Sequence, residues 1–243
     1  MNMNRAILLV FFCFSFIHVF SQEKSILTVS YDCLYRTSEE QTEPFHGTWI
    51  LNHGETSSQY YGKSEVVNGI LFDHSGMYRI YKNLPEVNRL TFREGYAEKY
   101  YYTEDMPNFS WEMLDGDTTI CSYSCQKAVT HFRGRTWYVW YSVDLPYNDG
   151  PWKLCGLPGL IMKAEDSKGD YSFTASKIEK GGENIRLDIK GYKNIKPLEW
   201  EKRMKEKAAH PITDDMKNML IDIPQNLIPK PKTVCFMEYF DKE

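Results

Sequence analysis

From Leu27 to Tyr35 every second residue is apolar or aromatic, and polar residues such as Ser30 and Asp32 stand between them. Successive side chains of a β-strand point to opposite faces, so this alternation predicts a strand with one face in a core. Shorter runs of the same kind recur at near-regular spacing, separated by turn signals such as Asn68-Gly69. We therefore predict a mainly β fold with a single antiparallel sheet system, as a curved sheet, an open barrel or a sandwich.

Further strands are expected where a short apolar or aromatic run lies between turn residues. They cover residues 49–51, 66–67, 70–72, 77–81, 89–93, 97–103, 109–114, 118–132, 136–143, 160–165, 171–176, 184–190 and 234–240. A different pattern begins at Pro197, which suits the first turn of a helix, and Trp200 and Met204 follow at a spacing of four. Pro211 ends that helix, and a second short C-terminal helix is expected at 213–223.

The first residues have the pattern of a secretory signal peptide. Arg5 is the only charged residue there, an apolar run follows from Ala6 to Phe20, and Ser21 is a small residue before a polar stretch. The apolar run is shorter than the roughly 18 residues of a membrane-spanning helix. We expect residues 1–21 to be removed, and residues 22–243 to form one exported domain that does not span the membrane. The expected location is the periplasm or the outer envelope, with the cell exterior as the alternative.

Composition narrows the classes of function. Aromatic residues make up 15% of the chain, which is enough to build a core and argues against disorder. The formal net charge is −4 and no basic stripe occurs, so no nucleic-acid partner is expected. The histidines show neither a His-x-x-x-His nor a His-Glu-x-x-His spacing, and no nucleotide-binding motif occurs, so no metal or cofactor is expected.

One segment carries a more specific signal. It reads Gly134-Arg135-Thr136-Trp137-Tyr138-Val139-Trp140-Tyr141, then Gly150-Pro151-Trp152-Lys153, then Cys155-Gly156-Leu157-Pro158-Gly159-Leu160-Ile161. Here the chain resembles the GLPGLI family of exported envelope proteins, named for the hexapeptide that stands at 156–161. The resemblance extends upstream through 123–128 to Trp111 and downstream to about Ile178. It implies export to a bacterial envelope, and it transfers no catalytic residue, ligand or cofactor to this chain.

The glycines and prolines of this segment predict two tight turns. Residues 157–160 fit a type II turn, in which Pro158 takes the second position and Gly159 takes a positive φ at the third. Residues 148–151 fit another turn. The favoured interpretation is a structural corner between two strands, and the alternative is a rigid loop that presents Trp152 to a ligand.

Candidate binding residues lie in this loop and in the aromatic strand before it. They are Trp137, Trp140, Gly150, Pro151, Trp152, Gly156, Leu157, Pro158 and Gly159. On a strand, Trp137 and Trp140 point to opposite faces. The aromatic residues form either a platform for a sugar, peptide or lipid, or the packing of a strand covered on both sides, which is the favoured interpretation.

Five cysteines remain after residue 21, namely Cys33, Cys121, Cys125, Cys155 and Cys235. An exported protein can form disulfides, and an odd number leaves at least one thiol without an intramolecular partner. The predicted bridge joins Cys155 to Cys121 or Cys125, and the resemblance favours Cys125 because it stands in the family-like segment 123–128. The alternative is that every thiol is buried singly as a small apolar group.

The expected function is that of a non-enzymatic binding or accessory protein of the envelope, for a peptide, a lipid or a partner protein. The alternative is a thiol- or metal-dependent hydrolase built from Cys125, His131 and the pair Arg133 and Arg135. A catalytic cysteine and histidine must lie within hydrogen-bond reach, yet six residues along a strand span about 20 Å. The two arginines can bind a ligand carboxylate or pair with acidic neighbours at a strand end.

Overall fold

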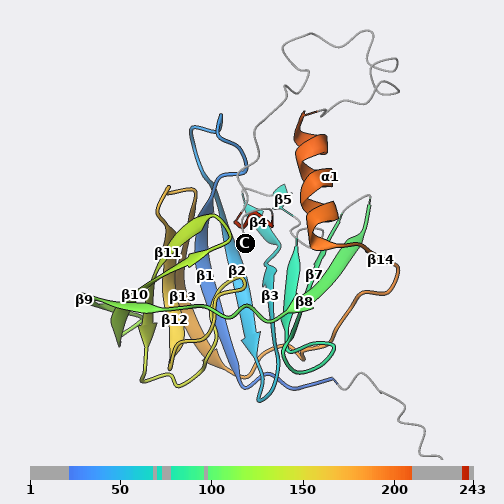
Figure 1. Ribbon diagram of the computed structural model, residues 1–243. Helices are drawn as coiled ribbons and strands as arrows, with labels where there is room; N and C mark the ends of the chain where they lie inside the picture. Colours follow the sequence, from blue (N-terminus) through green and yellow to red (C-terminus); the bar gives the residue numbers. More distant parts are fainter. Residues whose placement is uncertain (1–21, 68–69, 73–77, 96–97, 210–236, 241–243) are drawn as a thin grey trace, which may run out of the picture.

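The computed structural model describes residues 22–67, 70–72, 78–95, 98–209 and 237–240 (Figure 1). Within these residues the strands are β1 (Leu27–Tyr35), β2 (Phe45–His53), β3 (Ser58–Gly62), β4 (Glu65–Val67), β5 (Ile70–Phe72), β6 (Arg79–Lys82), β7 (Arg89–Glu94), β8 (Tyr100–Asp105), β9 (Glu112–Ile120), β10 (Tyr123–Phe132), β11 (Arg135–Ser142), β12 (Leu160–Asp166), β13 (Tyr171–Lys180) and β14 (Lys193–Asn194). One helix, α1, covers Pro197–Ala209.

Twelve of the strands form one sheet, in the order β14-β8-β7-β6-β3-β2-β1-β13-β12-β11-β10-β9. Its neighbouring strands are antiparallel, except that β14 runs parallel to β8. The hairpin of β4 and β5 forms a separate two-stranded sheet. The large sheet is not closed into a barrel, since β14 and β9 lie at its two ends. The prediction of a mainly β, antiparallel fold is therefore confirmed.

The order of the strands forces the sheet to curl. β8 and β9 follow each other in the sequence and are joined by only six residues, 106–111. They lie ten positions apart in the sheet, which in a flat sheet is about 50 Å. Six extended residues span only about 20 Å, so the two ends of the sheet must approach each other. The sheet consequently encloses a deep concave side (Figure 1).

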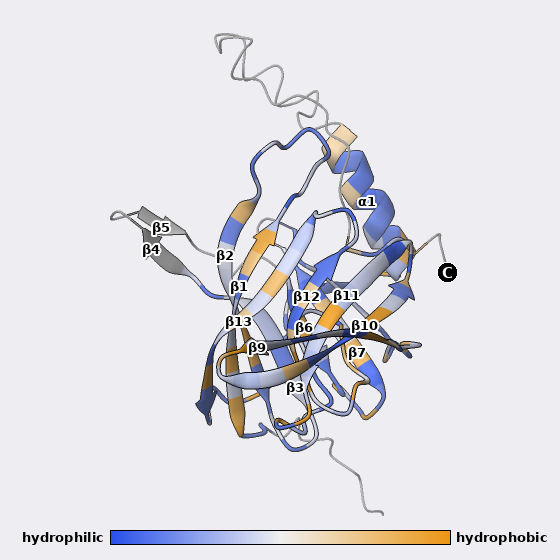
Figure 2. Ribbon diagram, turned by 90° about the vertical axis from the view of Figure 1, so that its left-hand side faces the viewer, coloured by the Kyte–Doolittle hydropathy of each residue, from blue (hydrophilic) through white to orange (hydrophobic). Residues whose placement is uncertain are grey.

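Aromatic side chains fill that concave side. The ring of Trp49 stacks on Tyr78 at 4.3 Å, and Phe92 stacks on Tyr102 at 4.9 Å. Such pairs contribute roughly 0.5–1.5 kcal/mol beyond the burial of their area. The alternation seen in the sequence supplies these side chains, because inward-facing positions such as Tyr31 are fully buried. Apolar and polar segments accordingly alternate along the strands (Figure 2).

The helix α1 begins at Pro197, as the sequence predicts, and stands beside β8 at one end of the sheet (Figure 1). Its Trp200 ring packs on Phe92 at 5.1 Å, and the indole nitrogen donates a hydrogen bond of 2.7 Å to Glu94. The second predicted helix, 213–223, lies outside the described residues. Of the helical segments that the structure describes, none has the length and apolar character to cross a membrane.

Three strand predictions are corrected. The predicted strand 118–132 is a hairpin of β9 and β10, and it turns at Cys121 and Ser122, whose φ angles are 49° and 69°. Glycine or asparagine usually marks such a turn, so Cys-Ser gave no signal. In the predicted strand 184–190, only Ile185 pairs, through an isolated bridge to Glu23. Of the predicted strand 234–240, residues 237–240 are described and form no strand.

Candidate functional site

The segment 143–159, which carries the glycine- and proline-rich motif and joins β11 to β12, packs into the core of the molecule. Trp152 is only 1% exposed, and its ring lies 5.3 Å from that of Trp137 and 6.1 Å from that of Phe132. Leu154 and Leu157 are buried in the same core. This placement corrects the interpretation in which the loop presents Trp152 to a ligand, and it agrees with a structural corner.

The motif glycines are required for close packing rather than for the predicted turn. Gly159 does not have the predicted positive φ; instead, a Cβ atom there would lie 2.1 Å from the carbonyl oxygen of Ser142. A Cβ atom on the buried Gly150 would lie 2.7 Å from the side chain of Ile161. The exposed Gly156 does have a positive φ, of 95°. The type II turn prediction failed because the backbone of Gly159 approaches β11 directly, a tertiary contact that sequence does not reveal.

Other candidate residues of the loop and of the aromatic strand divide between the core and the surface. Pro151 is buried and Pro158 is exposed. Trp137 is fully buried on the concave side, whereas Trp140 is half-buried on the outer face, where the amines of Lys163 and Lys127 lie 4.4 and 5.0 Å from its ring. β11 is thus covered on both faces, and its two tryptophans do not form one platform.

A first charged cluster fixes the loop to the sheet, and we call it the Asp149 cluster. The buried amine of Lys82 on β6 donates to Asp149 Oδ1 at 2.6 Å, to the carbonyl oxygen of Gly150 at 2.8 Å and to that of Leu154 at 3.1 Å. The Nδ1 atom of His53 lies 2.7 Å from the other carboxylate oxygen. Burial alone would raise the pKa of Asp149, but the charge of Lys82 and the bond to His53 hold it well below its usual value. Asp149 is therefore an ionised anchor.

A second charged cluster joins the motif loop to β8, and we call it the Lys153 cluster. The fully buried Lys153 amine pairs with both Glu104 and Glu238. Arg133 Nη1 also bridges these two carboxylates, at 2.7 and 2.8 Å. Burial would raise the pKa of Glu104, but Lys153 and Arg133 hold it below its usual value, whereas burial raises the pKa of Glu238 despite the attraction of Lys153. Lys153 and Arg133 thus share the carboxylates of Glu104 and Glu238.

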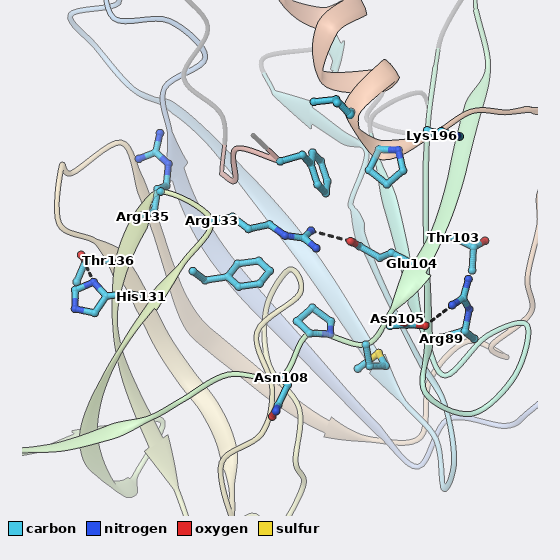
Figure 3. A pocket seen from close by; sticks show the side chains of 17 residues that line it. Arg89, Thr103, Glu104, Asp105, Asn108, His131, Arg133, Arg135, Thr136 and Lys196 are labelled. Carbon is cyan, nitrogen blue, oxygen red and sulfur yellow. Dashed lines mark hydrogen bonds and ion pairs between the residues drawn. The ribbon is translucent and has the colours of Figure 1, made fainter. Parts of the chain in front are cut away.

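A pocket of about 1070 Å³ opens above the Lys153 cluster. Five parts of the chain build its wall: Arg89 at the start of β7, the end of β8 with the connector to β9, the turn between β10 and β11, the start of α1, and Phe240. Figure 3 shows Arg133 and Glu104 pointing toward one another, with the pair Arg89 and Asp105 at one side. The lining combines apolar and charged side chains, namely Met106, Pro107, Phe132, Pro197, Leu198 and Phe240 with Arg89, Glu104, Asp105, Arg133, Arg135 and Lys196.

Of the proposed hydrolase residues, His131, Arg133 and Arg135 line the pocket, but Cys125 does not. His131 is exposed and its Nδ1 lies 2.8 Å from the hydroxyl of Thr136. Cys125 is buried and is not among the residues that line the pocket beside His131. Arg135 pairs with Asp166 and Asp170, as expected for an arginine with acidic neighbours at a strand end. Within the described part of the chain, no group of three or more His, Cys, Asp or Glu side chains is arranged to hold a metal ion.

The predicted disulfide between Cys125 and Cys155 is wrong. Both thiols are free, as are those of Cys33 and Cys121, and Cys235 lies outside the described residues. The two thiols face different surroundings: Cys155 lies near the charges of Lys82 and Asp149, and Cys125 lies near Cys121. Burial raises the pKa of Cys155 to about 11 and also raises that of Cys125, so these thiols stay protonated and are weak nucleophiles at neutral pH.

No motif or spacing in the sequence indicates the two charged clusters. Lys153 and Asp149 stand in the motif, but their partners on β6 and β8 are separated from them by long stretches of sequence. Glu238 has no motif around it. Charged residues on strands usually lie in solvent, so Lys82 and Glu104 had no feature that marked them as buried partners.

No protein-family model matches this chain, and no curated protein matches it significantly. Among solved structures, PNGF-II is similar to it in two crystal forms. The P21 form has a TM-score of 0.52 at 17% identity and covers 74% of this chain; the C2 form has a TM-score of 0.50 at 16% identity and covers 76%. In both cases the match spans 33% of PNGF-II. The chain therefore shares its fold with about a third of the length of PNGF-II.

Proposed function

We propose that this protein is a GLPGLI-type, exported binding protein of the cell envelope, and that it holds a peptide, a lipid or a segment of a partner protein in the pocket above the Lys153 cluster. Residues 1–21 would direct its export, and residues 22–243 would act in the periplasm, on the outer envelope or outside the cell. The role is binding rather than catalysis.

The construction of the pocket is the observation that carries this proposal. Ligand sites are concave, largely apolar and equipped with a few fixed polar groups, and a volume near 1000 Å³ is ample for a small ligand or a short peptide segment. Here the apolar wall includes Phe132 and Leu198, and ion pairs hold Arg89 and Arg133 in place before any ligand arrives. Fixed groups lose little conformational entropy on binding, which favours affinity.

The alternative of a thiol-dependent hydrolase has weaker support. Its nucleophile would be Cys125, which is buried, carries a raised pKa and does not line the pocket that His131 lines. A cysteine nucleophile needs a lowered pKa and a base within hydrogen-bond reach. The geometry therefore favours a binding role over this reaction.

Native mass spectrometry tests the proposal on protein purified from its own envelope. Leu198 lines the pocket and is 57% exposed, so Leu198→Asp changes the pocket without disturbing the core. Val87 is 69% exposed and is not a lining residue, which makes Val87→Asp a matched control. We expect wild type and Val87→Asp to carry the same bound mass and Leu198→Asp to lose it. Equal spectra for all three proteins would contradict the proposed site.

A further inference from the structure

The segment 237–240 packs against the aromatic core through Met237 and Phe240. Its residue Glu238 is 4% exposed and supplies one of the two carboxylates of the Lys153 cluster. Phe240 packs edge-on against Tyr102 at 5.7 Å and lies under the guanidinium of Arg133 at 4.5 Å. It also lines the pocket. This segment therefore forms part of the wall of the proposed site.

Residues 237–240 are held by side-chain contacts and a few backbone hydrogen bonds, as a bound peptide is. It belongs to none of the described strands, and its backbone donates from Tyr239 to the carbonyl oxygen of Arg133 at 2.9 Å and from Phe240 to the carboxylate of Glu201 at 2.7 Å. Glu238 is buried and Phe240 packs against the core, so the recognised pattern is a glutamate followed two positions later by a phenylalanine.

The charged groups around Glu238 indicate which kind of ligand group this position favours. Lys153 comes from the motif loop, Arg133 from the turn between β10 and β11, and Glu104 from β8. Glu238 is one of the two carboxylates that pair with the fully buried Lys153 amine, and the other, Glu104, is shared with Arg133. A buried charge without a partner is strongly unfavourable, so a second carboxylate has to fill the position. Phe240 adds an aromatic contact over the amine of Lys153, 5.1 Å from the ring centre.

We infer that this position is a recognition site for an acidic peptide, and that residues 237–240 are its internal occupant. A partner protein with a Glu-x-Phe segment would displace them and place its own carboxylate between Lys153 and Arg133. This inference rests on the proposed function, because it names the class of ligand for the same pocket.

The test uses the full chain and a synthetic eight-residue peptide with the sequence of residues 236–243, Phe-Met-Glu-Tyr-Phe-Asp-Lys-Glu. In wild type the tethered segment competes at an effective concentration on the order of 1 mM, so the peptide should bind only weakly. Glu238→Gln weakens the binding of residues 237–240 in the site by removing a charge. Phe240→Ala weakens the same binding and leaves every charged residue in place. Glu179→Gln, on the exposed part of β13, is the matched control.

We expect titration calorimetry to show that Glu238→Gln and Phe240→Ala each bind the peptide at least tenfold more tightly than wild type and Glu179→Gln. A peptide with glutamine in place of its first glutamate should lose this gain. Equal binding of both peptides, or no gain in either variant when circular dichroism shows that it is folded, would overturn the inference. If envelope-purified protein nevertheless keeps a bound mass that Leu198→Asp removes, the binding function stands, and a lipid or another ligand replaces the acidic peptide.

Discussion

Asp149 and Lys153 stand four residues apart in one loop, yet the clusters around them are built in different ways. The Asp149 cluster joins the loop to β2 and β6. The amine of Lys82 donates all three of its hydrogen bonds to residues of the loop itself. The Lys153 cluster borders an open pocket and takes one of its carboxylates from Glu238 in the C-terminal segment. The same loop thus provides a structural anchor at Asp149 and part of the proposed binding site at Lys153. Burial of charge alone does not distinguish the two roles; the source of the partner groups does.

The largest expected effect comes from breaking the anchor. Asp149→Ala leaves the Lys82 amine buried without its carboxylate, and removal of one partner from a buried pair costs about 3–5 kcal/mol. Urea denaturation of the mature protein measures this change in the free energy of unfolding. Glu165→Ala removes the partner of Lys163 from a partly exposed pair and should cost only about 0–1 kcal/mol. Similar losses in the two variants would mean that the Asp149 cluster is not an anchor.

A smaller loss of stability is expected in the Lys153 cluster. Glu238→Gln keeps the shape of the side chain, and Glu104 remains to compensate Lys153 and Arg133. The loss should be near the worth of one hydrogen bond to a charged group, about 1.5–3 kcal/mol. The same urea series checks it. A loss larger than that of Asp149→Ala would assign the anchoring role to the C-terminal segment instead.

The two clusters should respond to pH with opposite signs. The pKa of Asp149 is lowered, so its contribution to stability is present above the unfolded value of about 3.8 and is lost as the pH falls below it. The pKa of Glu238 is raised, so its contribution is present below the unfolded value of about 4.5 and is lost as the pH rises through the folded value. In urea denaturation between pH 7 and pH 3, the difference between wild type and Asp149→Asn should shrink in acid, whereas the difference between wild type and Glu238→Gln should grow. Parallel pH curves for the two differences would contradict this assignment.

The smallest expected effect is a change in the rate at which the segment around Cys155 opens locally. Burial raises the pKa of this thiol to about 11, so its native alkylation should be slow. Asp149→Ala frees the neighbouring loop and should speed the labelling of Cys155 by iodoacetamide, measured by peptide mass spectrometry, while Glu238→Gln should leave the rate unchanged. Faster labelling in both variants would show that the clusters open together.

Local patterns predicted the elements of this molecule better than their connections. The alternation around Tyr31 and the proline at Pro197 correspond to β1 and α1 because strand faces and helix starts are local properties. The turn at Cys121 was missed because its residues are unusual for that turn. The pairing of Lys82 with Asp149 depends on how the sheet curls, and no local pattern encodes it. For the same reason the motif loop was recognised, but its buried position was not.

The most direct test of the difference between anchor and site follows the two buried lysine amines separately, by ¹⁵N NMR of their ammonium groups in full-length Glu238→Gln. Addition of the peptide with the sequence of residues 236–243 should shift the signal of Lys153 and leave that of Lys82 unchanged. Binding of the peptide without any shift at Lys153, or with equal shifts at both lysines, would contradict the account.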